Sequence, residues 1–113
     1  MNTHPATLPD KSNLEFATGG FILKNTGRLC SWNEIEKIVA YKVDLLTIDD
    51  IRLDIDFPEF VVTISEDDPG FELFLKKMKE ALPGILENWY EKVVQPPFAA
   101  NPTIIFNKNY LIE

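Results

Sequence analysis

Charged and aliphatic side chains alternate along residues 51–57, which read IRLDIDF. An extended strand places every second residue on one face, so Arg52, Asp54 and Asp56 share a face, with about 7 Å between successive members. Two carboxylates at such a separation can serve as the acid and base of a hydrolase, or they can hold Mg²⁺ or Ca²⁺. This face is therefore a candidate catalytic site, cation site or docking surface.

These carboxylates belong to a strongly acidic part of the chain. Residues 44–68 contain nine acidic residues and one basic residue, whereas the rest of the chain is about neutral and the whole chain carries a net charge of −7. A concentrated negative field attracts a basic protein or a cation and repels nucleic acid and anionic membranes. The charge pattern predicts a basic protein partner, with no nucleic acid and no membrane. The candidate binding residues are Lys42, Asp44, Asp49, Asp50, Arg52, Asp54 and Asp56.

Ordinary structural roles compete with the docking hypothesis. A row of like charges on one strand also protects a sheet against unwanted edge pairing. Residues 49–50 lie between two predicted strands, where aspartate commonly builds a turn. Lys42 and Asp44 share one face of the preceding strand and can pair across to Arg52 or Asp54.

Residue types exclude most other site chemistry. The single histidine, His4, lies in the N-terminal leader, so the predicted domain offers no Ser-His or Cys-His pair. The single cysteine, Cys30, is expected to be a small core hydrophobe, and no cluster of cysteine and histidine suits zinc. No cofactor and no metal are expected.

Length and composition indicate one domain. The chain of 113 residues can bury a single core, and its 45% hydrophobic content is ordinary for a globular protein. Residues 1–13 contain prolines and polar residues without periodicity and are interpreted as a flexible leader, followed by a single domain over residues 14–113. A membrane span of roughly 20 apolar residues and a secretory signal are both missing, which favours a cytoplasmic location.

The first half of the chain is predicted to be rich in strands. Short extended pieces fill residues 14–27, with turns at Gly19–Gly20 and at residues 25–27, and residues 28–32 return as a strand. Residues 34–44 fit either a helix or a strand. A helical turn at residues 31–36 followed by a strand is favoured, because β-branched and aromatic residues crowd positions 38–43.

The second half is predicted to add two helices and a closing strand. Residues 51–57 and 59–66 form antiparallel strands, and Asp67-Asp68-Pro69 caps a helix whose apolar stripe includes Phe71, Phe74 and Met78. A second helix covers residues 85–94, and residues 103–106 form the last strand. The predicted fold is α+β: an antiparallel sheet of about five strands with two C-terminal helices packed on one face and a closing strand.

Spaced patterns between Trp32 and Phe106, about 75 residues, resemble a group of small uncharacterised bacterial proteins. The patterns are W-x-x-I-x-x-I-x-A-Y-K-x-D from Trp32, P-G-F from Pro69, L-P-G from Leu82, W-x-x-x-V from Trp89 and P-F-A-x-N from Pro97. The resemblance implies no activity and no catalytic residue.

Three functional hypotheses remain open from the sequence. The leading one is a non-enzymatic cytoplasmic binding protein whose acidic sheet face docks a basic protein, similar in character to an immunity protein that inhibits a toxin enzyme. The second is a small carboxylate- or Mg/Ca-dependent hydrolase that uses Asp54, Asp56 and Glu66. The third is a module that binds a small apolar ligand between the helices and the sheet.

Overall fold

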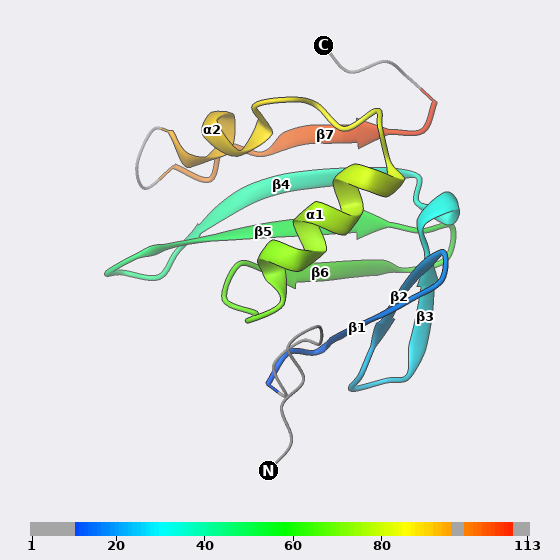
Figure 1. Cartoon of the computed structure of the whole chain (residues 1–113). Helices are drawn as coiled ribbons and strands as arrows, with labels where there is room; N and C mark the ends of the chain where they lie inside the picture. The colour runs from blue at the N-terminus through cyan, green and yellow to red at the C-terminus, as the bar shows by residue number, and fades with distance from the viewer. Residues whose placement is uncertain (1–10, 96–98, 110–113) are drawn as a thin grey trace.

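The computed structural model describes residues 11–95 and 99–109. Figure 1 shows antiparallel sheets and two helices, which is the α+β class that the sequence predicts. The elements along the chain are β1 (Leu14–Ala17), β2 (Gly20–Leu23), β3 (Arg28–Ser31), the 3₁₀ turn η1 (Trp32–Glu34), β4 (Lys37–Asp44), β5 (Asp49–Asp56), β6 (Val61–Ser65), α1 (Phe71–Ala81), α2 (Trp89–Val94) and β7 (Thr103–Asn107).

The larger sheet has the strand order β6-β5-β4-β7, with every pair antiparallel. Alternation along β5 buries Ile51, Leu53 and Ile55, and the helices cover this face in Figure 1. Burial of one face and exposure of the other is what a period of two in hydrophobicity produces. The favoured prediction of a helical turn followed by a strand is also confirmed, since η1 leads directly into β4.

The prediction of one sheet with about five strands is wrong in detail. The described residues form seven strands in two sheets, because β1, β2 and β3 pair with one another as a separate three-stranded sheet. Trp32 N donates to Gly19 O, and Ile35 N donates to Trp32 O. These two bonds end the small sheet at η1 and redirect the chain into β4.

Two predicted turns shape the small sheet. Gly19 and Gly27 have φ angles of +76° and +72°, a region that glycine enters without steric cost. Gly20 packs so closely that a Cβ there would lie 2.2 Å from the carbonyl oxygen of Cys30. Cys30 is fully buried, as the sequence predicts, and burial raises the pKa of its thiol.

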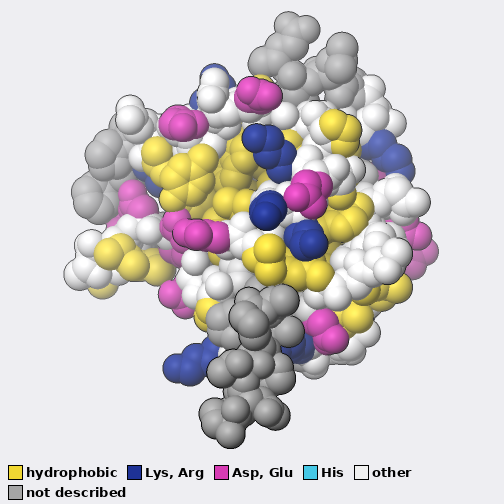
Figure 2. All heavy atoms as spheres, viewed as in Figure 1, with side chains coloured by type: hydrophobic (Ala, Val, Ile, Leu, Met, Phe, Trp, Pro, Cys, Tyr) yellow, Lys and Arg dark blue, Asp and Glu magenta, His cyan; other side chains and the backbone are white. Residues whose placement is uncertain are grey.

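Helix α1 joins the two sheets into one core. The ring of Phe74 lies 5.1 Å from that of Phe21, 5.5 Å from that of Trp32 and 6.4 Å from that of Phe16, measured between ring centroids. Phe71 and Phe74 are buried as the helical stripe predicts. Between α1 and α2, however, hydrophobic side chains remain at the surface (Figure 2).

The helix caps differ from the sequence prediction. Helix α1 begins at Phe71 with Gly70 as its N-cap, so residues 67–69 form the preceding turn rather than the cap and first helical position. Helix α2 begins only at Trp89 instead of residue 85, because Leu86 N donates to Ile105 O and ties the preceding segment to β7. Asn88, with φ +64°, is the N-cap of the helix.

Asp68 instead fastens the N-terminal end of the described chain. Its carboxylate accepts hydrogen bonds from Ser12 Oγ at 2.6 Å, Asn13 N at 2.9 Å and Gly70 N at 2.7 Å. Partial burial alone would raise the pKa of Asp68, but these three bonds outweigh it and lower the pKa below its ordinary value. Ser12 and Asn13, which the sequence places in the leader, therefore contact the domain, while residues 1–10 lie outside the described residues.

Candidate functional site

The outer face of the larger sheet carries the charged row that the sequence predicts. Arg52, Asp54 and Asp56 alternate along β5 with the buried Ile51, Leu53 and Ile55, and so lie on the face away from the helices. Strand β5 starts two residues earlier than predicted, which adds Asp50 to this face. The expectation that residues 49–50 form the turn is therefore wrong, because both belong to the strand.

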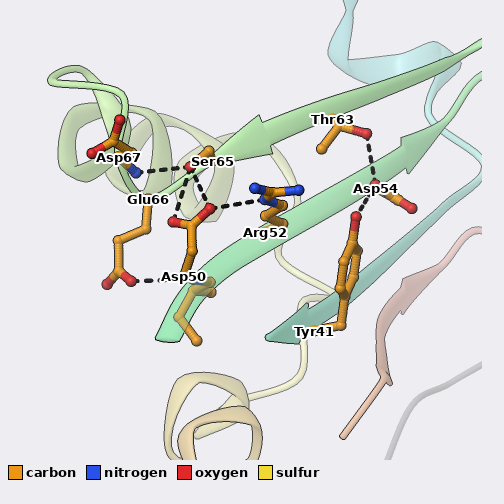
Figure 3. A network of polar contacts seen from close by, with 9 residues as sticks. Tyr41, Asp50, Arg52, Asp54, Thr63, Ser65, Glu66 and Asp67 are labelled. Carbon is orange, nitrogen blue, oxygen red and sulfur yellow. Dashed lines mark hydrogen bonds and ion pairs between the residues drawn. The ribbon is translucent and has the colours of Figure 1, made fainter. Parts of the chain in front are cut away.

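Asp50 is the centre of a compact polar network on this face (Figure 3). Arg52 Nε donates to its carboxylate at 2.8 Å, and Ser65 Oγ lies 2.9 and 3.0 Å from its two oxygens. Ser65 Oγ in turn accepts from Asp67 N at 2.9 Å. The Asp50 side chain is only 6% exposed, and its carboxylate raises the pKa of Arg52 through the hydrogen bond between them. The network stabilises the charged form of Arg52 and ties β5 to β6.

The carboxylates of Asp54 and Asp56 contact different side chains. Tyr41 OH and Thr63 Oγ1 both donate to Asp54 Oδ1, at 3.0 and 2.7 Å (Figure 3), while Asp56 lies 3.8 Å from Lys37 Nζ. Burial of the phenol, followed by its bond to Asp54, raises the pKa of Tyr41. These contacts bridge three neighbouring strands and give each carboxylate its own partners.

Lys42 does not belong to this face. Lys42 pairs with Ile51 in the β4–β5 register, whereas Tyr41 pairs with Arg52 and Val39 with Asp54. The prediction that Lys42 reaches across to Arg52 or Asp54 is thus wrong. Its side chain is 2% exposed on the helix-covered face, where Nζ donates to Val94 O at 2.7 Å and lies 3.6 Å from Asp49 Oδ2.

Glu66 lies apart from the two aspartates with which the hydrolase hypothesis groups it. Its carboxylate accepts from Ile51 N at 3.2 Å and from Tyr90 OH, in α2, at 2.6 Å. The bond to Glu66, together with burial, raises the pKa of Tyr90 to about 12. Glu66 thus contacts the helical layer, while Asp54 contacts Thr63 on the open face of the sheet. The fold therefore does not bring the carboxylates of Glu66 and Asp54 together as one acid–base pair.

The β4–β5 hairpin extends beyond its neighbouring strands. Strand β6 pairs with β5 only as far as Ser65 opposite Arg52, and β7 pairs with β4 only as far as Thr103 opposite Ala40. The end of the hairpin is therefore held chiefly by pairing between its own two strands, and Figure 1 shows it projecting from the body of the domain.

The tip of this hairpin, residues 45–48, is apolar and exposed. Leu46 is 90% exposed, Ile48 61% and Leu45 43%. The backbone of Leu46 has φ +79°, a region that non-glycine residues rarely adopt, and Leu46 N donates to Asp44 Oδ1 at 2.9 Å. Asp44 itself is exposed at the base of the tip.

The hairpin tip was not among the sequence-predicted site residues. A signal for it is present nevertheless: Leu-Leu-Thr-Ile occupies the position of a turn and lacks the glycine or asparagine that tight hairpin turns favour. Aliphatic residues in such a position have no core to enter and remain exposed, which makes the tip a candidate contact surface.

Within residues 11–95 and 99–109, no three His, Cys, Asp or Glu side chains lie close enough together to hold a metal ion. Across the same part of the chain, no helix is both long and apolar enough to cross a membrane.

Comparisons with known proteins place no further constraint on the site. The resemblance to small uncharacterised bacterial proteins therefore stays a prediction. No protein-family model, no curated protein and no solved structure matches the chain.

Proposed function

We propose that this chain is a protein-binding module that takes a basic protein partner at the tip and outer face of the β4–β5 hairpin. The observation that carries the proposal is the exposed aliphatic tip, with Leu46 held at a positive φ angle. Exposure of three large aliphatic side chains adds nothing to folding, and the left-handed backbone costs about 1 kcal/mol or more. A partner that buries the tip would gain roughly 1.5–3 kcal/mol per fully buried side chain, which offsets the cost of the strained backbone.

The charges around the tip favour a basic partner. Asp44 is exposed beside Leu46 at the tip, and Asp54 and Asp56 lie farther along β5 on the outer face. Ion pairs with Arg52 and Lys37 reduce the net charge of that face. In the proposed complex, the apolar tip supplies most of the contact energy, while the carboxylates speed the approach of a positively charged surface. An immunity-type inhibitor of a basic toxin enzyme is the specific form of this function that we propose.

The test compares two exposed aliphatic residues of similar exposure. Ile48→Ser alters the tip, and Leu29→Ser alters β3, where the leucine is 56% exposed. With the purified chain as bait in an extract of its source cells, the parent and Leu29→Ser should retain the same basic protein. Ile48→Ser should retain at least about tenfold less of it, as a loss at an interface hot spot produces.

The rate at which the captured protein associates with the chain can then be measured. Association of the parent should slow as salt is added, because screening weakens the approach of opposite charges. Equal capture by Ile48→Ser and Leu29→Ser would refute the proposed site. A retained protein that is acidic would refute the proposed partner class. A toxin gene adjacent to that of this chain would support the immunity-type role.

A further inference from the structure

A groove with an apolar floor runs between α1 and the segment that leads into α2. One part has a volume of about 520 Å³ and the next part about 370 Å³, and Leu75 and Tyr90 line both, so the two parts adjoin. Figure 2 shows this hydrophobic surface between the two helices. The aliphatic and aromatic residues of the floor are Leu75, Met78, Leu82, Ile85, Leu86 and Trp89.

The rim of the groove is acidic. Among the described residues that line it, Lys79 is the only basic one. Glu87 and Glu91 are exposed, and their side chains form no hydrogen bond or ion pair with the described part of the chain. Their charges are therefore available to a ligand. The six acidic residues of the rim are Glu66, Asp67, Asp68, Glu72, Glu87 and Glu91.

We propose that this groove binds a basic amphipathic helix of a partner protein. An apolar floor requires an apolar ligand face, and a rim of six carboxylates against one ammonium requires cations beside that face. Helix α1, which forms one wall, has 11 residues and is thus about 16 Å long, the length of three turns of a ligand helix. A helix with leucines along one stripe and lysines beside it meets all three requirements.

The groove is already formed in the unbound chain. Tyr90 OH is held by Glu66, and the rings of Trp89 and Tyr90 meet edge to face with centroids 5.5 Å apart. Leu86 is tied to β7 through its backbone N–H. Little rearrangement is needed on binding, which keeps the entropic cost of association low. This proposal concerns a surface other than the hairpin tip and does not rest on the function proposed above.

The test uses a synthetic helical peptide of about 15 residues, built from leucine and lysine with an amphipathic pattern. A matched peptide carries glutamate in place of every lysine. Titration of each into the isotope-labelled full chain, followed by NMR, should show binding of the lysine peptide alone. The amide signals that shift should belong to groove residues such as Leu75, Leu86 and Trp89, and the affinity should fall as salt is raised.

Two double variants with reversed charges test where on the protein the lysine peptide binds. Glu87→Lys combined with Glu91→Lys should weaken binding of the lysine peptide at least about tenfold. Glu15→Lys combined with Glu34→Lys serves as the control, because it changes the net charge equally at exposed positions that do not line the groove. This pair should weaken binding of the lysine peptide less than about threefold. Ile48→Ser, at the hairpin tip, should leave peptide binding unchanged. Thermal unfolding of each variant confirms that it is folded.

Several outcomes would overturn the proposal. One is equal weakening by the two charge-reversed pairs, which would indicate nonspecific attraction to an acidic protein. Others are shifts confined to the hairpin tip, comparable binding of the glutamate peptide, and no binding at about 1 mM peptide. Sedimentation showing a dimer that Glu87→Lys with Glu91→Lys dissociates would assign the groove to a second copy of this chain instead.

Discussion

The two ends of the β4–β5 hairpin carry the same kind of side chain in opposite environments. Ile38, Leu53 and Ile55 are completely buried where β6, β7 and the helices surround the hairpin, whereas Leu46 and Ile48 are largely exposed where the hairpin continues alone. An aliphatic side chain stabilises the fold only where other elements remove it from water. Those at the buried end therefore act in folding, and those at the tip can contribute only when another molecule covers them.

Lys42 lies at the boundary between the two ends. It is the last residue of β4 on the covered face, and the backbone carbonyl of Val94 and the carboxylate of Asp49 satisfy its ammonium. Beyond it, Asp44 is exposed. The change from buried core to exposed surface thus takes place within two residues.

The largest expected effect comes from shortening an aliphatic side chain at the buried end. Leu53→Ala removes methyl groups that are fully enclosed and leaves a cavity, so the free energy of unfolding should fall by about 2–5 kcal/mol. Ile48→Ala at the tip should change it by less than about 0.5 kcal/mol. Denaturant unfolding of both variants measures the difference. A similar loss in the two variants would show that the tip packs against the domain.

An intermediate effect is expected at the boundary. Lys42→Met keeps the length of the side chain but removes the ammonium that Val94 O and Asp49 contact. Because Asp49 is 20% exposed and partly solvated, the expected loss is about 1–3 kcal/mol, below that for a fully buried pair. Lys37→Met, which breaks an exposed pair with Asp56, should cost less than about 0.5 kcal/mol. Equal losses in thermal unfolding would mean that burial at Lys42 has no energetic consequence.

The smallest expected effect has the opposite sign. Leu46→Asn places a residue that tolerates positive φ at the strained position, so the free energy of unfolding should rise by about 0.5 kcal/mol, while partner capture falls. Leu45→Asn, whose backbone does not have a positive φ, serves as the control and should give no increase. A decrease in stability for Leu46→Asn would show that Leu46 contributes packing and would weaken the case for a binding tip.

Much of the local structure could be predicted from residue order. The alternation in residues 51–57 placed Arg52, Asp54 and Asp56 on one face, and the turn at residues 25–27 follows from asparagine and glycine. The stripe with Phe71 and Phe74 likewise predicted α1. These features depend on a repeat of two or of about 3.6 residues, and such repeats are visible within a few positions of the chain.

Tertiary structure alone decided which strands pair and what each charge contacts. The separation of β1, β2 and β3 into their own sheet, and the place of β7 beside β4, depend on partners far away in the sequence. Lys42 is buried because α2 brings Val94 over it, 52 residues later in the chain, and the exposure of Leu46 follows from where β6 and β7 stop. The order of residues along a segment shows the spacing of its apolar side chains, and this spacing predicts a strand or a helix. Burial of those side chains depends on which other elements pack against the segment, and those elements meet it only in the folded chain.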